Sequence, residues 1–369
     1  MIARPFICSL HALQHAEIMS AARPILVTGG SGFLGSWVVK CLLDRGHHVR
    51  TTVRSLAKAQ FLLSIPGHES TDKLQIYEGV DLNKAESWDC AFEGGVVDAV
   101  IHTASPFFFE NGTEENLVLP AVNGTRNVLS ACNKHNVKTV VLTSSTAAIY
   151  VHHGTRAADH VYTEQDWSPE DVLRSKHNWY ALSKTLAEQL AWDVSRQADC
   201  TFTLSVMNPT LIMGGQLPGQ PHLNTSLATL VGYFDGVSMK EMENSCKSLV
   251  DVRDCALAHV LAATEKKAEA AGKRFLLIAA SPHSTEIAAA VKKALPVELQ
   301  KNVPTTVCST LPTSNVMANP APNPVLWSSH TEAVLGLQFR GVEEMVGSGV
   351  QSCLENGFNS RTMYSTDKL

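Results

Sequence analysis

The stretch PILVTGGSGFLG, residues 24–35, decides the fold of this chain. A short, mostly apolar run typical of a buried strand leads into four glycines and then into a helical run that ends before Gly46. The glycines satisfy both G-x-G-x-x-G and the variant G-x-x-G-x-x-G. Glycines between a strand and a helix allow a tight turn and the close approach of a pyrophosphate, which the helix N-terminus attracts. The stretch therefore predicts a dinucleotide-binding turn with contacts from Gly29, Gly32, Phe33, Leu34 and Gly35.

Basic residues follow the second predicted strand, 47–53. NAD-binding proteins place an acidic residue there to hold the ribose 2′-hydroxyl, but no acid occurs between Asp44 and Glu69. Arg54 comes directly after the strand and Lys58 about one helical turn later, where both can bind a 2′-phosphate. A solvated basic surface is the alternative interpretation. We predict NADP(H) as the cofactor.

Strands and helices continue to alternate over the first 208 residues. This rhythm predicts an α/β fold, a Rossmann-type doubly wound parallel sheet. Ligands of such sheets bind beyond the carboxyl ends of the strands. Asp81 could contact adenine or could cap the next segment, and both interpretations stay open. Further cofactor contacts are expected at the strand ends, from Thr103, Ala104, Ser105, Asn208 and Pro209.

The stretch NWYALSKTLAE, residues 178–188, predicts a helix, because it lacks Pro and Gly and is rich in helix formers. Tyr180 and Lys184 are four residues apart and so lie on one helix face. An ammonium group beside a phenol lowers its pKa, which suits a general acid or base near neutral pH. The spacing alone is common by chance. Ser144 and Ser145, which end the strand predicted at 139–142, could donate hydrogen bonds to a substrate carbonyl or could be ordinary caps.

The alternation becomes irregular after residue 208. A Gly/Pro-rich loop at 214–221 is followed by strands at 247–252 and 275–279 and by scattered helices. We predict an unstructured extension at residues 1–22, an NADP-binding domain at 23–208 to which 247–264 returns, and a smaller C-terminal substrate-binding lobe at 209–369.

Composition and charge exclude several classes of protein. With 44% hydrophobic and 18% charged residues, the chain is neither disordered nor fibrous. A net charge of −5 without a polybasic run argues against a nucleic acid or an anionic membrane as partner. The nine scattered cysteines contain no Cys-x-x-Cys, so we expect reduced thiols in the cytoplasm and no metal site. A small molecule is the expected partner of a monomer or homodimer.

Together the glycine turn, the serine pair and Tyr180-x-x-x-Lys184 resemble the extended short-chain dehydrogenase/reductase family. The stretches TVR (52–54), PAVNGTRNVL (120–129) and VDVRD (250–254) are similar to its branch of dihydroflavonol reductases, cinnamoyl-CoA reductases and fungal aldehyde or ketone reductases. The resemblance covers about residues 24–357.

This resemblance implies roles for individual residues. Tyr180 would donate the proton, Lys184 would bind the nicotinamide ribose and lower the pKa of the tyrosine, and Ser145 would polarise the carbonyl, with Thr146 as the alternative hydroxyl. Arg54 matches the position that selects NADP, and Asp81 with Leu82 matches the adenine contact.

Two departures from related enzymes narrow the activity. Cinnamoyl-CoA reductases follow the Trp-Tyr pair with Cys-Tyr, whereas Ala181 and Leu182 stand here, so reduction of a CoA thioester is not supported. Residues 146–148 are Thr-Ala-Ala and lack the acid pair of sugar-nucleotide dehydratases. We predict NADPH-dependent reduction of an aldehyde or ketone on a small, aromatic or polyketide-like molecule. The alternatives are an epimerase or hydroxysteroid-type dehydrogenase and a non-catalytic dinucleotide sensor.

Overall fold

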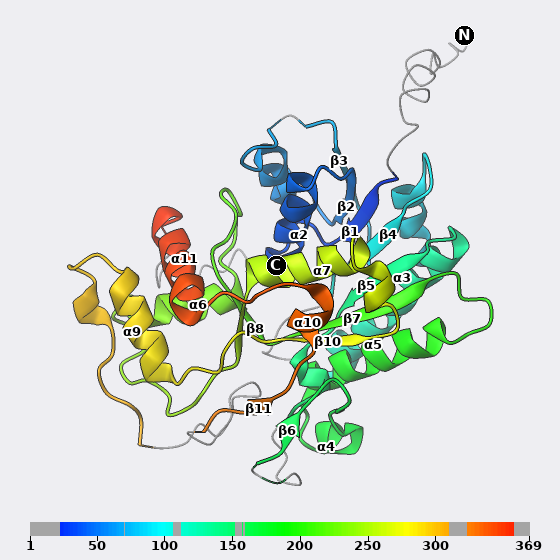
Figure 1. Ribbon diagram of the computed structural model, residues 1–369. Helices are drawn as coiled ribbons and strands as arrows, with labels where there is room; N and C mark the ends of the chain where they lie inside the picture. Colours follow the sequence, from blue (N-terminus) through cyan, green and yellow to red (C-terminus); the bar gives the residue numbers. More distant parts are fainter. Residues whose placement is uncertain are drawn as a thin grey trace.

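The computed structural model describes residues 23–69, 71–105, 112–151, 157, 159–309 and 323–357. Residues 1–22, predicted to form an extension, lie outside this part of the chain. A seven-stranded parallel sheet with the order β10-β7-β5-β4-β1-β2-β3 forms the centre (Figure 1). Its strands are β1 (Ile25–Thr28), β2 (Val49–Val53), β3 (Leu74–Glu78), β4 (Ala99–His102), β5 (Thr139–Thr143), β7 (Thr203–Pro209) and β10 (Arg274–Leu277).

The strand order reverses beside β1. The chain runs outward from β1 to β3 and then returns to place β4 on the other side of β1. Thr28 at the end of β1 pairs in register with His102 at the end of β4, and Thr28 Oγ1 lies 2.7 Å from His102 Nδ1. Such a reversal is the topological switch point at which doubly wound sheets bind ligands. It brings the residues that follow β1 and β4 together.

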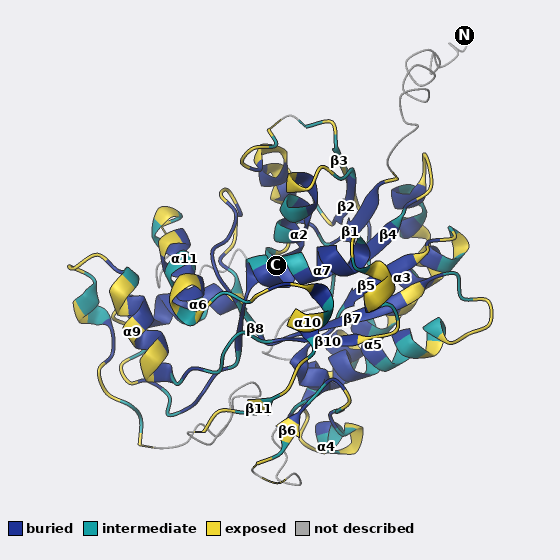
Figure 2. Cartoon of the chain, viewed as in Figure 1, coloured by how far each residue is buried: buried dark blue, intermediate teal, exposed yellow. Residues whose placement is uncertain are grey.

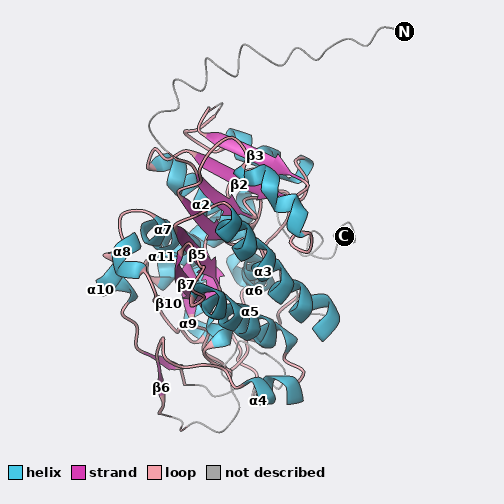
Figure 3. Ribbon diagram, turned by 90° about the vertical axis from the view of Figure 1, so that its right-hand side faces the viewer, coloured by secondary structure: helices cyan, strands magenta, loops and turns pink. Residues whose placement is uncertain are grey.

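Helices cover both faces of the sheet. On one face α2 (Phe33–Asp44) packs beside α7 (Val252–Ala263), and on the other α3 (Leu119–Lys134) packs beside α5 (Trp179–Ser195) (Figure 3). Successive residues of a strand point to opposite faces. Ile25 and Val27 accordingly join the core of α2 and α7, whereas Leu26 joins the core of α3. Figure 2 shows the resulting burial of the sheet. The predicted Rossmann-type fold class is thus confirmed.

Short elements connect these layers. The segment before the Tyr180 helix contains β6 (Val161–Tyr162) and a short helix, α4 (Glu170–Ser175). Strand β6 pairs in parallel with β11 (Leu326–Trp327), from near the end of the chain. No helix of the described residues is both long and apolar enough to cross a membrane. The remaining short helices are η1 (Ala57–Ser64), η2 (Ala85–Phe92), η3 (Glu114–Val118), η4 (Thr146–Ala148), α8 (Lys267–Ala270), η5 (Gln300–Asn302) and α10 (Thr331–Leu335).

The second half of the chain is divided between the sheet and a lobe. Helices α6 (Thr225–Phe234), α9 (Ser284–Ala294) and α11 (Val342–Glu355) share a separate apolar core beside the sheet, next to the strand pair β8 (Leu211–Met213) and β9 (Leu249–Asp251) (Figure 1). One expectation needs correction. The strand predicted at 275–279 was assigned to the lobe, but β10 pairs in parallel with β7 at the edge of the central sheet. Sequence patterning did not reveal this, because the strand's partner lies far away in the chain.

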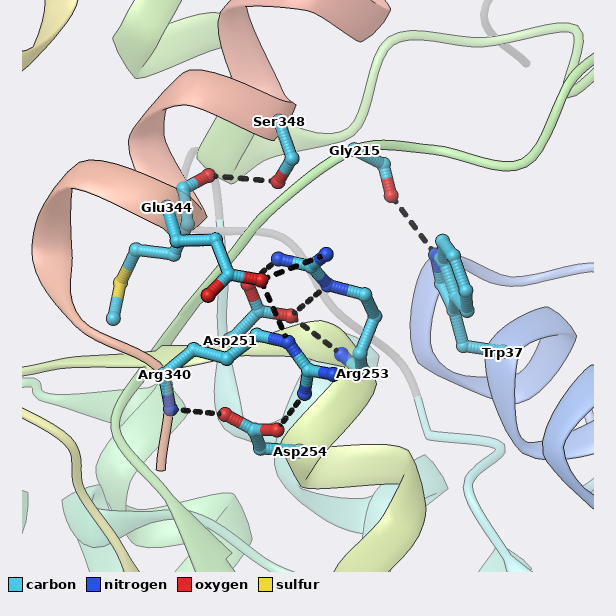
Figure 4. A network of polar contacts seen from close by, with 9 residues as sticks. Trp37, Gly215, Asp251, Arg253, Asp254, Arg340, Glu344 and Ser348 are labelled. Atoms are coloured by element: carbon cyan, nitrogen blue, oxygen red, sulfur yellow. Dashed lines mark hydrogen bonds and ion pairs between the residues drawn. The ribbon is translucent and has the colours of Figure 1, made fainter. Parts of the chain in front are cut away.

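An ionic network joins the lobe to the helical layer of the sheet (Figure 4). The backbone N–H of Arg340, which precedes α11, donates to Asp254 of α7 at 2.7 Å, and the Arg340 guanidinium pairs with Asp254 and with Glu344. Arg253 bridges Asp251 at 2.7 Å and Glu344 at 3.3 Å. Burial raises the pKa of Asp254. A buried charge must keep its partner, so the network fixes how α11 sits on α7.

Candidate active site

The turn after β1 is built so that only glycine fits at its critical positions. Gly29 has a φ of +72°, and its N–H donates to the Thr52 carbonyl at 3.1 Å. A Cβ added at Gly35 would lie 2.3 Å from the Gly29 carbonyl oxygen, a separation that real Cβ atoms do not adopt. The helix therefore begins directly against the turn, as the motif predicts.

The start of α2 fits a bound pyrophosphate. Gly32 at the N-cap provides no side-chain hydrogen bond, and the first turn holds no acidic residue. The first backbone N–H groups of a helix have no partner within it and attract anions. Gly32 is exposed, and a Cβ there would meet only the Gly29 carbonyl oxygen within 4 Å. Phe33, Leu34 and Gly35 form the turn that follows, so the predicted pyrophosphate contacts lie at one helix end.

The residues expected to contact the adenosine half lie beyond β2 and β3. Arg54 directly follows β2, Lys58 lies in η1, and both are exposed. One carboxylate oxygen of Asp81 accepts the Asn83 N–H at 2.9 Å, so Asp81 stabilises a turn whatever else it contacts. Leu82 packs against α3 at Gly124. A Cβ added at Gly124 would lie 3.1 Å from the Leu82 Cβ.

The residues after β4 join the glycine turn to helix α5. Thr103 Oγ1 donates to the Thr28 carbonyl at 2.6 Å, and the Ala104 N–H donates to Thr28 Oγ1 at 3.1 Å. Ser105 Oγ accepts from Lys184 Nζ at 3.0 Å. Burial, together with the charge of Lys184, lowers the pKa of His102 at the end of β4 to about 3. His102 is therefore neutral, and Lys184 supplies the positive charge here.

Helix α5 presents Tyr180 and Lys184 from one face, as the spacing predicts. The Asn178 side chain caps the helix by accepting the Ala181 N–H at 3.2 Å. Tyr180 is only 8% exposed, and its side chain hydrogen-bonds to Ser145. Lys184 Nζ lies 5.8 Å from the centroid of the Tyr180 ring. A phenol, a hydroxyl and an ammonium thus converge beside the switch point.

The pKa values in this cluster correct one expectation. We expected Lys184 to lower the pKa of Tyr180, but burial raises it to about 12, offset in part by the hydrogen bond with Ser145. Burial also lowers the pKa of Lys184 to about 8. The effect of burial on the phenol therefore outweighs any lowering by Lys184. Tyr180 is the protonated partner at neutral pH.

The three hydroxyls that follow β5 have different partners. Ser144 Oγ donates to Glu188 at 2.6 Å, and Thr146 Oγ1 donates to the Pro209 carbonyl at 3.2 Å. Ser145 Oγ accepts the Ala147 N–H at 3.1 Å and meets Tyr180. Of the three, Ser145 is the hydroxyl that the fold directs to the phenol.

Two buried residues at the site escaped the sequence analysis. Glu188 continues the four-residue spacing of Tyr180 and Lys184, and Arg274 of β10 pairs with it at 2.6 Å. The same carboxylate accepts Asn208 Nδ2 at 2.8 Å. The spacing was a usable signal for Glu188, but a glutamate on a helix is usually exposed. Nothing in the sequence links Arg274 to it.

The Gly/Pro-rich loop at 214–221 lies against the glycine turn. Trp37 Nε1 on α2 donates to the Gly215 carbonyl at 2.8 Å (Figure 4). Gln220, which is buried, donates from Nε2 to the Ser31 carbonyl at 3.3 Å. The loop at 214–221, with which the lobe begins, therefore contacts the predicted nucleotide site.

Comparison with known proteins agrees with this arrangement. Residues 26–307 match the 3-beta hydroxysteroid dehydrogenase/isomerase family. Cinnamoyl-CoA reductase 1 of Arabidopsis thaliana is 34% identical over 339 residues, which are 91% of each chain. A putative NADPH-dependent methylglyoxal reductase of Candida albicans is 34% identical over 290 residues, 73% of this chain and 81% of the relative.

Solved structures show the same fold. Yeast methylglyoxal/isovaleraldehyde reductase Gre2, in complex with NADPH, superposes with a TM-score of 0.77 at 28% identity, covering 91% of this chain and 99% of that one. Vestitone reductase from alfalfa (Medicago sativa L.) superposes with a TM-score of 0.72 at 28% identity, with the same coverage. The chain therefore belongs to the 3-beta hydroxysteroid dehydrogenase/isomerase family, within the extended short-chain dehydrogenases/reductases that its motifs predicted.

Proposed function

We propose that this protein is an NADPH-dependent reductase of an aldehyde or ketone carbonyl on a small molecule. The observation that carries the proposal is the buried pair of Tyr180 and Ser145 with Lys184 beside it, next to a glycine turn at the switch point of the sheet. The relatives in the family whose names describe an activity are reductases, which supports the direction of the reaction.

The proposed cofactor site would use residues at the ends of five strands, β1, β2, β3, β4 and β7, together with helix α5. The free start of α2 would hold the pyrophosphate, Arg54 and Lys58 the 2′-phosphate, and Lys184 the nicotinamide ribose. When bound, NADPH supplies the hydride that adds to the carbonyl carbon. The other proposed cofactor contacts are Asp81, Leu82, Thr103, Ala104, Ser105, Tyr180, Asn208 and Pro209.

Tyr180 supplies the proton. With a pKa raised to about 12 by burial, the phenol stays protonated at neutral pH and can protonate the oxygen as the carbonyl is reduced. Ser145, in hydrogen-bond contact with Tyr180, stabilises the charge that develops on that oxygen. Thr146 is the weaker candidate, because its hydroxyl donates to Pro209. Lys184 orients this end of the site through Ser105.

The lobe would select the substrate. We assign to it residues 209–369 apart from 247–264 and β10, which belong with residues 23–208 in the nucleotide-binding part. An aromatic or polyketide-like carbonyl compound is supported by relatives such as tetraketide alpha-pyrone reductase 2 of Arabidopsis thaliana, 36% identical over 270 residues. Ala181 and Leu182 favour an aldehyde or ketone over a CoA thioester.

Eight described cysteines are free thiols, which supports a cytoplasmic location.

A carbonyl panel tests the proposal. We expect the purified protein to oxidise NADPH in the presence of aromatic aldehydes or ketones, followed by the loss of NADPH absorbance, with CoA thioesters and NADH assayed in parallel. Turnover should be slower with the thioesters and with NADH. An NAD cofactor that stays bound through purification, without NADPH turnover, would indicate an epimerase-type enzyme and contradict the proposal.

A further inference from the structure

A buried carboxylate lies behind the Ser145–Tyr180 pair. Glu188 is on α5, one turn beyond Lys184 and two beyond Tyr180, and is fully buried. We propose that Glu188 is a positioning residue that holds Ser145 in register with Tyr180, so that the serine can act on the substrate oxygen. The inference rests on the proposed function and deepens it, because it explains how the site is kept assembled.

The Glu188 carboxylate ties three strands to the catalytic helix. Its Oε2 accepts from Ser144 Oγ at 2.6 Å and from Asn208 Nδ2 at 2.8 Å, and its Oε1 accepts from Arg274 Nε at 2.6 Å. Ser144 follows β5, Asn208 lies in β7, and Arg274 begins β10. The Glu188 side chain of α5 therefore hydrogen-bonds to residues of three strands or of the turn that follows one of them.

Two of these contacts act on Ser145. Ser144 precedes it in the chain, and Asn208 Nδ2 donates to the Ser145 carbonyl at 3.1 Å as well as to Glu188. Both partners of that amide group are acceptors, so the orientation of the Asn208 side chain is determined. Ser144 bonds directly to the Glu188 carboxylate, and the Ser145 carbonyl is linked to the same carboxylate through Asn208. The Ser145 hydroxyl, which accepts the Ala147 N–H, then has one direction in which to meet Tyr180.

Arg274 pairs with the Glu188 carboxylate in a fixed geometry. Its side chain is 8% exposed and donates from Nη1 to the carbonyl oxygens of Glu164 and Asp166 at 2.8 and 2.6 Å. It also lies 3.8 Å over the ring of Trp167. Because the guanidinium is itself held on several sides, the ion pair has a defined geometry, as buried pairs need.

The chemistry of the contacts requires a carboxylate at position 188. Ser144, Asn208 and Arg274 all donate to Glu188, and Trp192 Nε1 donates at 3.3 Å. An ionised carboxylate accepts only, whereas glutamine carries an NH₂ group that would face one of these donors. Glu188→Gln keeps the size of the side chain and breaks this match. The variant therefore tests hydrogen bonding separately from packing.

The test measures steady-state kinetics of NADPH-dependent reduction. In Glu188→Gln we expect kcat to fall about 30-fold while KM for NADPH changes less than about twofold, because a displaced Ser145 affects the reacting oxygen and not the glycine turn. Ser144→Ala, which removes one donor and leaves the carboxylate, should lower kcat about 3- to 10-fold. This milder variant decides the matter if Glu188→Gln does not fold.

A double-variant cycle separates positioning from general stability. If Glu188 acts through Ser145, adding Glu188→Gln, or Ser144→Ala, to a Ser145→Ala enzyme should cost less than about threefold in kcat. The matched control is Asp254→Asn on α7, which alters the ion pair of another buried carboxylate with an arginine. This variant should lower the melting temperature and keep kcat within about twofold.

Three outcomes would overturn the inference. These are an unchanged kcat in both Glu188→Gln and Ser144→Ala, equal losses with and without Ser145, and an equal loss of kcat in Asp254→Asn. A wild-type protein that fails to oxidise NADPH with any compound of the carbonyl panel would instead refute the proposed function, and the positioning role with it. Wild-type activity is therefore measured first.

Discussion

The sheet half of the molecule and its lobe bury different kinds of side chain. At the carboxyl edge of the sheet the buried groups are polar, and Tyr180, Lys184 and Glu188 each hydrogen-bond to a serine. The core of the lobe, between α6, α9 and α11, is apolar. A polar cluster works only with all its partners in place, whereas an apolar core tolerates exchange of residues of similar volume. Exchange of buried residues should therefore be tolerated less at this edge of the sheet than in the core of the lobe.

Removing the proposed proton donor should produce the largest difference between the two halves. We expect Tyr180→Phe to lower kcat by about 10² to 10⁴, the usual contribution of positioned proton transfer, because the ring stays packed and only the hydroxyl is lost. NADPH binding, followed by fluorescence, should persist. Near-normal turnover would contradict the role of Tyr180, and loss of NADPH binding would show a disturbed site instead.

Cofactor choice should depend on Arg54, which directly follows β2. We expect Arg54→Gln to raise KM for NADPH about 10- to 100-fold, since a charged bond to the 2′-phosphate is lost, and to leave KM for NADH unchanged. Arg45→Gln is the matched control, because Arg45 is a basic residue near the end of α2 that pairs with Glu265 at 2.6 Å. Equal changes in KM for NADPH and for NADH would mean that Arg54 does not contact the 2′-phosphate.

Burial of Lys184 should lower the free energy of unfolding, whereas burial of the apolar side chains of the lobe should raise it. Burial lowers its pKa from 10.5 to about 8. Between these pH values the unfolded chain binds a proton that the folded chain has released, so stability rises with pH across this window, and the cost is fully present below about pH 8.

We therefore expect Lys184→Met to be more stable than the wild type at pH 7, by about 1 to 3 kcal/mol in the free energy of unfolding. The gain should shrink as the pH approaches 10.5, which denaturant titrations at several pH values can follow. A gain that does not depend on pH would mean that packing, and not the buried charge, is responsible.

The smallest effect is expected where the lobe meets the sheet. Arg340→Gln leaves Asp254 with a weaker partner, so we expect a lower melting temperature and a rise of about two- to fivefold in KM for the carbonyl substrate. The kcat value and KM for NADPH should stay within about twofold. A large loss of kcat would mean that the ionic network of Figure 4 reaches the reacting groups.

Sequence reasoning predicted the features that repeat or that depend on neighbours in the chain. The alternation of strands and helices, the turn at 29–35 and the helix of Tyr180 follow from local patterns, and the structure contains them all. It could not place β10, because a short apolar strand does not reveal its partner. It also predicted a lowered pKa for Tyr180, whereas burial, which depends on the whole fold, raises it.

The sequence by itself determined the family, the Rossmann-type sheet and the residues that meet at its edge, because glycine geometry and helical spacing are local properties of the chain. Only the tertiary structure decided what those residues do to one another. It paired Ser145 with Tyr180, turned Ser144 toward Glu188 and brought Arg274 of a distant strand to that carboxylate. The physical reason is that burial and charge pairing arise between segments far apart in sequence, where no local pattern records the partner.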